Sequence, residues 1–588
     1  MTESTAAESK SNEDNKVVTI SAPGKALIAG GYLVLERPNP GLVLATDSSF
    51  HTTITTRPPH YVESLERGGV CNDDHNNGSD TTLNQSFPLD VYSPQFHETY
   101  TYSVHLNTKS TEQSLSLRPR FINQPSNSYI EKTVIVTLST ILAANANGKE
   151  SSSSSPIHEL ISVFHKSSDK KALAIKLRAD NDFYSIVPHL KEYKLNPIPS
   201  DIHKLPSFLP CPMSEVETEG PSDRNDINGE VKKAKTVKKI VEVNKTGLGS
   251  SAALVTSLVG ALLAYFNVVS IPAAGNKKEV NNKDFKLVHN LAQICHSFAQ
   301  GKIGSGFDVS AAVYGSHVYT RFDKSIIAFV MDQLSNDLAQ CQDGQKVIMV
   351  NTGLKLWNCV SDFDKWNAEV EQLALPPGIQ VLMADICGGS ESPSMAKKVL
   401  AWKKNEEEEK KVADESEVGG VSGSTSTSTC TSGAREWLEL QKVNISLKNL
   451  FQKGCVDGIS RIEDENSLMD AIRRSILDSR KYLKAMGESA GVPIEPDEQT
   501  KLADDTMGIP GVIAAGIPGA GGYDALFVLY KENDGSSSDT TAIRDTIGQF
   551  WMDWCDQRKK DGKRGVVCPL SCKCAEFGQG LKHSTLEW

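Results

Sequence analysis

This chain has no excess of basic residues over acidic ones. Its 588 residues include 73 acidic and 62 basic side chains, which gives a formal net charge of -11. A general nucleic-acid-binding protein normally carries a basic excess, so this balance argues against nucleic acid as a partner. A positive pocket remains compatible with these numbers, because the net charge says little about any one cleft.

A disulfide framework and a secretory signal are also missing. The 12 cysteines are few for a chain of this length, and reduced thiols are the simplest interpretation. The N-terminus is polar and has no apolar core, so we expect a disordered tail over residues 1–16. The last residues match no simple retention or peroxisomal signal. We therefore expect a cytoplasmic protein, with a peroxisomal location left open.

Long apolar runs are rare as well. One uncharged run, SSAALVTSLVGALLAYFNVV, is long enough to cross a bilayer, which takes about 20 residues. It follows directly on a glycine turn and opens with two serines, and no comparable segment accompanies it. We therefore expect a helix buried in a globular core, and no membrane partner.

Strand-like and helix-like segments alternate along the chain, which indicates α/β or α+β architecture. A second strand-rich start near residue 346 predicts two domains, residues 17–345 and 346–588. Helical patterns are expected at residues 284–300, 394–404, 434–453 and 465–487. Polar or charged stretches are expected to be insertions or linkers, at residues 66–86, 151–155, 214–236 and 403–433.

A glycine-rich turn lies between a strand and a helix in KTGLGSSAA, residues 245–253. Glycines let backbone N–H groups approach phosphate oxygens, and a helix N-terminus adds partial positive charge. A plain turn before a capped helix is the alternative. The turn is not a P-loop, since no Lys-Ser or Lys-Thr pair follows its glycines. A dinucleotide-binding turn would need an acidic residue about 20 positions on, and that region is uncharged.

Three motifs together resemble those of the GHMP small-molecule kinases. They are SAPGKALIAGGYLVLE, KTGLGSSAA and GIPGAGGYDALF, and they occur in the family order over nearly the whole chain. GGYLVLE, QGKIGSGFDVSAAVYGS and ADICGGSESPSMAKKVLAWK are similar to the phosphomevalonate kinases of the fungal and plant type. The resemblance implies ATP-dependent phosphorylation of 5-phosphomevalonate to 5-diphosphomevalonate with Mg²⁺, in the pathway that supplies isoprenoid and sterol precursors.

The resemblance also implies an α+β fold. The N-terminal domain, residues 17–345, would be ribosomal-S5-like, with an unusual left-handed β-α-β element and the ATP loop. The C-terminal domain, residues 346–588, would be ferredoxin-like, with a low-complexity insertion at 403–433. The active site would lie in the cleft between them.

Two residues match the catalytic positions of the family. Lys25 follows a predicted strand in a Pro-Gly turn, which can direct its ammonium group into a cleft. Asp308 follows a glycine turn at a predicted helix start, where an aspartate can also simply initiate the helix. The acceptor is itself a phosphate with a second pKa near 6, and so is mostly dianionic at pH 7. We therefore expect Asp308 to orient Lys25 or help organise Mg²⁺ rather than to take a proton.

The resemblance assigns further residues to ligands. The ATP-binding residues would be Lys245, Thr246, Gly247, Leu248, Gly249, Ser250, Ser251, Ala252 and Ala253. The acceptor-binding residues would be Lys302, Ser390, Ser392, Ser394, Gly519, Ala520, Gly521 and Gly522. Capping of a helix by Ser392 and a bare turn at the last glycines are the structural alternatives.

Metal binding departs from the family pattern at one point. Mevalonate kinases carry a Mg²⁺-binding glutamate where this chain has His296 or Ser297. Mg²⁺ would then depend on Ser250, Ser251, Asp308 and ATP itself. A second group, Cys568, Cys572, Cys574 and His583, suggests zinc but lacks a standard spacing. The competing functions are a GHMP kinase for an alcohol such as mevalonate and a non-catalytic nucleotide sensor.

Overall fold

The computed structural model describes the chain in fourteen parts. They are residues 16–57, 84–107, 113–121, 124–146, 172–220, 234–273, 282–339, 341, 344–386, 392–417, 432–457, 465–531, 540–562 and 565–588. Nearly all of the predicted tail, and the predicted insertion at 151–155, lie outside these residues.

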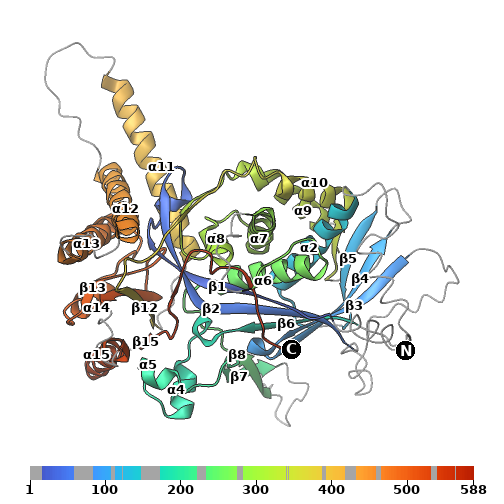
Figure 1. The fold of residues 1–588 in the computed structure, drawn as a ribbon, viewed down its shortest axis with the longest axis horizontal. Helices are drawn as coiled ribbons and strands as arrows, with labels where there is room; N and C mark the ends of the chain where they lie inside the picture. Colours follow the sequence, from blue (N-terminus) through green and yellow to red (C-terminus); the bar gives the residue numbers. More distant parts are fainter. Residues whose placement is uncertain are drawn as a thin grey trace, which may run out of the picture.

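A large mixed sheet forms the first layer of the molecule (Figure 1). Its order is β10-β5-β4-β3-β6-β2-β1-β17; β9 and β16 also pair with β2, and β11 pairs with β9. The strands are β1 (Val18–Ala29), β2 (Pro40–Arg57), β3 (Asn84–Ser93), β4 (Glu98–Asn107), β5 (Ser114–Pro119), β6 (Ala172–Ala179), β9 (His317–Thr320), β10 (Lys346–Met349), β11 (Glu369–Gln372), β16 (Cys574–Ala575) and β17 (Lys582–His583). β3 and β6 are parallel, but the hand of their connection stays a prediction.

Helices pack against this sheet and bury its apolar side chains. They are α2 (Ser128–Ala146), α6 (Ser250–Tyr265), α7 (Lys283–Gln300), α8 (Phe307–Tyr314), α9 (Ser325–Ala339) and α10 (Val350–Ser361). Nearly every residue of α6 is buried, because the helix lies against β1 and β2 and is flanked by α2 and α7. The longest apolar run is therefore a core helix, as predicted. Within the described ranges no helix has the length and apolar content needed to cross a membrane.

Short elements complete the first layer. They are η1 (Leu33–Leu35), η2 (Pro94–Phe96), η3 (Asn181–Phe183), α4 (Val187–Tyr193), α5 (Pro199–Ile202), β7 (Met213–Gly220) and β8 (Ala234–Val241). β7 and β8 pair as an antiparallel hairpin. Most described residues of the predicted insertion at 214–236 are therefore regular structure, because cross-strand backbone pairing is available even to a highly charged sequence.

The second layer is a four-stranded antiparallel sheet with the order β13-β14-β12-β15. Along the chain the elements are β12 (Ile379–Ile386), α11 (Ser392–Glu417), α12 (Ser432–Asp457), α13 (Glu465–Ala490), α14 (Asp497–Thr506), β13 (Val512–Gly516), β14 (Ala525–Lys531), α15 (Thr540–Lys560) and β15 (Val567–Pro569). The helical parts follow the first and third strands, which is the ferredoxin-like arrangement predicted for this half. The α+β fold class is confirmed.

The chain changes layer later than the predicted boundary. β10 begins at residue 346, yet it pairs with β5 of the large sheet, and β11 pairs with β9. The chain then returns at its other end, where β16 pairs with β2 and β17 with β1. An apolar pattern indicates a strand, but it does not indicate which sheet the strand will join.

The predicted linker at 403–433 is partly helical. Residues 403–417 form the second half of α11, which extends away from the body of the molecule in Figure 1. Alternating blocks of glutamate and lysine support a helix through pairs four residues apart, such as Lys404 and Glu408 at 3.5 Å. The charge run is therefore not a linker, whereas residues 418–431 lie outside the described part.

Candidate active site

A cleft of about 720 Å³ lies where the two layers meet. One side is formed by β1, η1 and the starts of α6 and α8, and the other by α11 and the turn between β13 and β14. The elements come from all three motifs of the sequence. Segments hundreds of residues apart therefore converge on one cavity.

Lys25 lies on β1 and lines this cleft. Its ammonium donates to the Gly247 carbonyl at 2.7 Å and lies 5.4 Å from the centre of the Phe307 ring. Its backbone N–H donates to the Leu248 carbonyl at 2.9 Å, which holds β1 against the glycine turn. Burial lowers the pKa of Lys25, and the Asp308 carboxylate opposes that effect. The lysine is thus directed into the cleft, as predicted. The predicted Pro-Gly turn before it is wrong, because β1 continues through these residues with a register shift between Pro23 and Lys25.

The glycine turn places backbone beside Lys25. Gly247 and Gly249 have φ of 82° and 77°, a region that a residue with a side chain rarely adopts. A Cβ atom on Gly249 would lie 3.0 Å from Lys25 Cε and 3.8 Å from Asp308 Cβ. Gly249 also caps α6, whose first N–H groups have no acceptor within the helix. The turn therefore brings the N-terminus of α6 to the lysine and the aspartate.

The other predicted ATP-binding residues differ in position. Gly247 and Gly249 line the cleft, and Lys245 is exposed nearby. Thr246 is fully buried and donates its hydroxyl to the Asp182 carbonyl, which anchors the turn from below. Four more are buried or partly buried in the turn and first helical turn, namely Leu248, Ser250, Ala252 and Ala253. Their side chains pack the motif, so any contact they make with a nucleotide would come from the backbone.

Asp308 lies in the first turn of α8 and lines the cleft beside the glycine turn. Its Oδ1 accepts the Val309 N–H at 3.0 Å, and its Oδ2 lies 3.9 Å from His296 Nδ1. His296 Nε2 lies 3.1 Å from the Ser251 hydroxyl. Burial lowers the pKa of His296, while Asp308 opposes that effect. His296 thus stands between Ser251 and Asp308, a position the sequence analysis had noted only as a departure from the family.

The titratable side chains of the cleft are mostly cationic. Two carboxylates, Asp308 and Asp524, line it together with five basic side chains, Lys25, Lys302, Arg321, Lys324 and Lys397. An acidic protein therefore has a cationic cavity, which favours anionic ligands. The sequence motifs did not predict Arg321, Lys324, Lys397 or Asp524 in this cleft. Lys397 lies within the quoted segment GGSESPSMAKKV, one helical turn from Ser394, and that spacing could have revealed it.

Only some of the predicted acceptor-binding residues line the cleft. Lys302 and Ser394 are exposed and line the cleft. Ser392 is the first residue of α11, which agrees with its predicted place at the helix start. Ser390 lies outside the described residues.

The third glycine motif forms the turn at residues 518–522. Gly519, Ala520 and Gly521 line the cleft, whereas Gly522 is buried and donates its N–H to the Ile494 carbonyl at 2.9 Å. The turn is fastened to β1 by a bond from Gly519 N–H to the Leu27 carbonyl at 2.9 Å. The Tyr32 hydroxyl donates to the Ala520 carbonyl at 2.6 Å, so the first and third motifs are joined directly.

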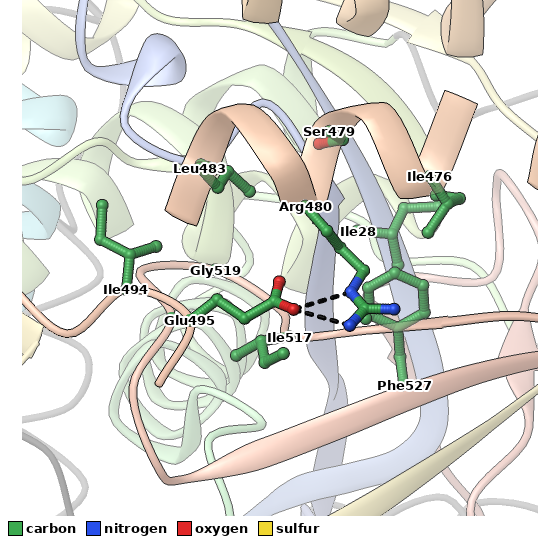
Figure 2. A pocket seen from close by; sticks show the side chains of 12 residues that line it. Ile28, Ile476, Ser479, Arg480, Leu483, Ile494, Glu495, Ile517, Gly519 and Phe527 are labelled. Atoms are coloured by element: carbon green, nitrogen blue, oxygen red, sulfur yellow. Dashed lines mark hydrogen bonds and ion pairs between the residues drawn. The ribbon is translucent and has the colours of Figure 1, made fainter. Parts of the chain in front are cut away.

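An ion pair supports this turn from behind. Figure 2 shows Arg480 of α13 directed at the Glu495 carboxylate, with bonds of 2.9 and 2.7 Å to one oxygen. Arg480 also pairs with Asp504 of α14 at 2.8 Å. Glu495 directly follows Ile494, whose carbonyl accepts the Gly522 N–H. Arg480 is therefore not on a solvated face of α13, because this side of the helix packs against β13; Arg474 is exposed.

Oxygen donors for Mg²⁺ are few in the cleft. No group of three or more His, Cys, Asp or Glu in the described part of the chain could hold a metal ion, which includes the C-terminal cysteines proposed for zinc. Asp308 and the half-buried Ser251 lie on opposite sides of His296. They fit an ion held mainly by nucleotide phosphates and water, since Mg²⁺ commonly takes only one or two protein carboxylates. Ser250 is 5% exposed, interacts with Tyr184 and does not line the cleft.

These features define a class of protein. A glycine turn, a lysine and an aspartate meet between a mixed sheet and a ferredoxin-like sheet, which is the arrangement expected of a GHMP kinase. The family model for the GHMP kinases N terminal domain matches residues 226–316, which contain the glycine turn and Asp308. The molecule has the GHMP kinase fold.

Curated relatives narrow the class. Peroxisomal phosphomevalonate kinase of Arabidopsis thaliana is 30% identical over 550 residues, which cover 88% of this chain and 91% of that protein. Phosphomevalonate kinase of Candida albicans is 30% identical over 520 residues, covering 87% and 89%. Among solved structures, Streptococcus pneumoniae phosphomevalonate kinase in complex with phosphomevalonate and AMPPNP shares 14% identity with a TM-score of 0.42, covering 90% and 97%. The chain belongs to the phosphomevalonate kinase family.

Proposed function

We propose that this protein transfers the γ-phosphoryl group of ATP to 5-phosphomevalonate, forming 5-diphosphomevalonate and ADP. The observation that carries the proposal is the cationic cleft, in which Lys25 and the N-terminus of α6 meet, in a chain of this family. The reaction joins two strongly anionic groups. Positioning and positive charge therefore matter more than proton removal.

The chemistry assigns a different task to each side of the site. The acceptor phosphate is mostly dianionic near pH 7, so its oxygen is already nucleophilic. The N–H groups at the start of α6 hold the ATP phosphates. Lys25 neutralises charge between donor and acceptor, and Asp308 keeps the lysine oriented. Burial lowers the pKa of Lys25, and a phosphate bound beside it would raise that pKa.

Mg²⁺ belongs to this proposal as the partner of ATP. When bound, it neutralises the phosphate charge that develops during transfer. Asp308 and Ser251 would hold it, together with oxygens of the nucleotide. His296 keeps both in place, because its two ring nitrogens face these two residues.

A comparison of two acceptors tests the function. Purified protein is given ATP and Mg²⁺ with either 5-phosphomevalonate or mevalonate, and ADP formation is followed. We expect turnover with 5-phosphomevalonate and a far lower kcat/KM with mevalonate. A preference for mevalonate would make the protein an alcohol kinase. ATP binding without turnover on either acceptor would favour the nucleotide-sensor alternative.

The proposal also covers the binding partners and the cellular location of the enzyme. We infer that its partners are small molecules, and that neither nucleic acid nor a membrane is bound. We place the reaction in the cytoplasm, although the Arabidopsis relative is named as peroxisomal. Microscopy of a fluorescent fusion in the source cells, with a peroxisomal marker, separates the two locations.

A further inference from the structure

The cations of the cleft form two groups. Lys25 and Lys302 act on the reacting centre, since Lys25 interacts with Asp308 and Lys302 with His296. Arg321 and Lys324 lie further along the cleft, beside the end of η1. Arg321 donates to the carbonyls of Ile303 and Gly304, which follow Lys302 directly. One short turn thus separates the two groups.

Arg321 is a buried cation without a paired carboxylate. It is 2% exposed and donates to the carbonyls of Leu35 at 2.8 Å and Ile303 at 3.2 Å, and to Gly304. No described carboxylate lies within ion-pair distance of its guanidinium, and its Nε has no hydrogen-bond partner in the described part of the chain. Buried charges in proteins are normally paired. Three carbonyl oxygens accept from Arg321, and the exposed Asp323 attracts it without forming an ion pair, so no described carboxylate is bonded to this charge.

Lys324 adds a second charge to the same place. Its side chain lines the cleft, and no described carboxylate forms an ion pair with it. The Glu36 carboxylate attracts Lys324 but is already paired with Lys403 of α11. Burial and Arg321 both lower the pKa of Lys324. Two like charges held together in a cavity are relieved when an anion binds between them.

We infer that Arg321 and Lys324 form a second anion subsite, which binds the carboxylate of the acceptor while its phosphate reacts beside Lys25. This inference rests on the proposed function. The acceptor carries one anion at each end of a short carbon chain, and the cleft carries one cationic group at each end of a short turn. Lys324 contacts the carboxylate directly, and the buried Arg321 adds positive charge behind Lys324. The subsite selects acceptors that bear a carboxylate and fixes which end reaches ATP.

The test is a comparison of acceptors across variants. The first acceptor is 5-phosphomevalonate, and the second is its analogue with a primary alcohol in place of the carboxylate. The test variant is Lys324→Met, which keeps the length of the side chain and changes an exposed position. Lys398→Met is the matched control, because Lys398 is an exposed lysine of α11 that does not line the cleft. Arg321→Lys retains a charge but not the three carbonyl contacts.

We expect the full-length enzyme to prefer the carboxylate acceptor by about tenfold to a hundredfold in kcat/KM, the usual worth of a charge-assisted contact. Lys324→Met should reduce that preference by roughly tenfold and raise KM for 5-phosphomevalonate more than KM for ATP. Lys398→Met should leave the preference as it is. Arg321→Lys should also reduce the preference, with a smaller effect on kcat.

The possible outcomes test the proposed subsite separately from the proposed function. Turnover of 5-phosphomevalonate with an unchanged acceptor preference in Lys324→Met would overturn the subsite and keep the function. An equal loss with both acceptors would also overturn it, because the lysine would then act on structure or on ATP. If no turnover occurs, calorimetry of 5-phosphomevalonate binding decides. Binding weakened by Lys324→Met supports the subsite without the function, and unchanged or absent binding overturns both.

Discussion

At the scale of single residues, the reacting centre depends on close approach. Lys25, Gly249 and Asp308 come from β1, the glycine turn and α8, and a Cβ on the glycine would lie within 3.8 Å of atoms of both other side chains. Little room is left for a side chain at the turn. The Lys25 ammonium therefore lies close to both the start of α6 and Asp308.

Replacement of the two charged residues should affect the reaction unequally. Lys25→Met should lower kcat by about a hundredfold to a thousandfold, the usual cost of losing one electrostatic group at a transition state. Asp308→Asn should retain more activity, because the dianionic acceptor does not need a strong base. Steady-state kinetics on both variants measure the difference. A folded Asp308→Asn enzyme that binds the acceptor but is inactive would contradict this account of the aspartate.

A glycine pair tests the close approach. Gly249 and Gly301 have φ of 77° and 71°, so alanine strains the backbone at both. Only at Gly249 does the new methyl group meet another residue, Lys25 Cε at 3.0 Å, whereas nothing lies within 4 Å at Gly301. We expect both variants to lose about 1 kcal/mol of stability, but only Gly249→Ala to lose more than about tenfold in kcat. Equal kcat values would show that Lys25 tolerates displacement.

At the scale of elements, α13 holds the third glycine motif in place. Arg480 ties this helix to Glu495 and to Asp504 of α14, and the chain beside Glu495 accepts the Gly522 N–H. Exposure of Arg480 and Glu495 is only 6% in each case. A buried pair of this kind stabilises little beyond an apolar pair of the same shape, but it is costly to break.

The ion pair predicts a specific pattern of stability. Arg480→Met should lower the free energy of unfolding by about 3–5 kcal/mol, because it leaves the Glu495 carboxylate buried without a partner. Arg480→Met combined with Glu495→Met should recover much of that loss. The exposed Arg474→Met is the control, with a change within about 0.5 kcal/mol. Urea unfolding measures all three, and a double variant no more stable than the single one would exclude this explanation.

Buried histidines near α8 predict a dependence on pH. Burial lowers the pKa of His317 to about 4, from 6.5; a contact with the Gly315 carbonyl opposes this, and His289 adds to it. In this pH range His317 is therefore protonated in the unfolded chain but neutral in the folded protein. The contribution of neutral His317 to the free energy of unfolding is fully present above about pH 6.5. It is lost as the pH falls toward 4, by up to about 3 kcal/mol.

Removal of this titration should flatten the pH profile. His317→Gln lowers stability at pH 7, because it disturbs the contacts with Ser310 and Gly315. Between about pH 6.5 and pH 5, however, its free energy of unfolding should fall less steeply than that of the original chain. Urea unfolding at several pH values gives both slopes. Equal slopes would mean that folding does not lower the pKa of His317.

At the scale of the whole molecule, charge is segregated. The chain has a formal net charge of -11, yet five basic side chains and only two carboxylates line the cleft. Both substrates of the proposed reaction are anions. The cleft attracts them against the repulsion of the remaining surface.

This segregation predicts a response to salt. Raising the ionic strength from about 0.03 M to about 0.3 M shortens the screening length well below the dimensions of the cleft. We expect kcat/KM for 5-phosphomevalonate to fall severalfold, mostly through KM. The fall should be smaller in Lys324→Met, which has one cation fewer, than in Lys398→Met. A kcat/KM that does not change with salt would show that the cationic cleft contributes nothing to capture.

The two layers are joined by contacts that cross the whole chain. Asp182 accepts bonds from the Ser571 N–H at 2.7 Å and its hydroxyl at 2.8 Å, while its own carbonyl holds Thr246 of the glycine turn. β17 then pairs with β1, the strand that carries Lys25. The ATP end of the cleft is thus attached to the C-terminal part of the chain.

Local chemistry of the sequence determined much of this protein. Glycine spacing predicted the turn before α6, alternation and apolar runs predicted most strands and helices, and three motifs in order predicted the family and a shared cleft for Lys25 and Asp308. These features depend on residues close together in the chain, whose preferred backbone angles and periodicities can be recognised without a partner.

Other features depend on contacts that form only in the folded chain. The tertiary structure placed β10 in the large sheet, buried Arg480, continued α11 through a charge run and brought Arg321 and Lys324 to one cavity. Whether an arginine meets water, a carboxylate or an empty cleft depends on residues far away in sequence. Burial and pairing are properties of the folded surroundings, and no local pattern specifies them.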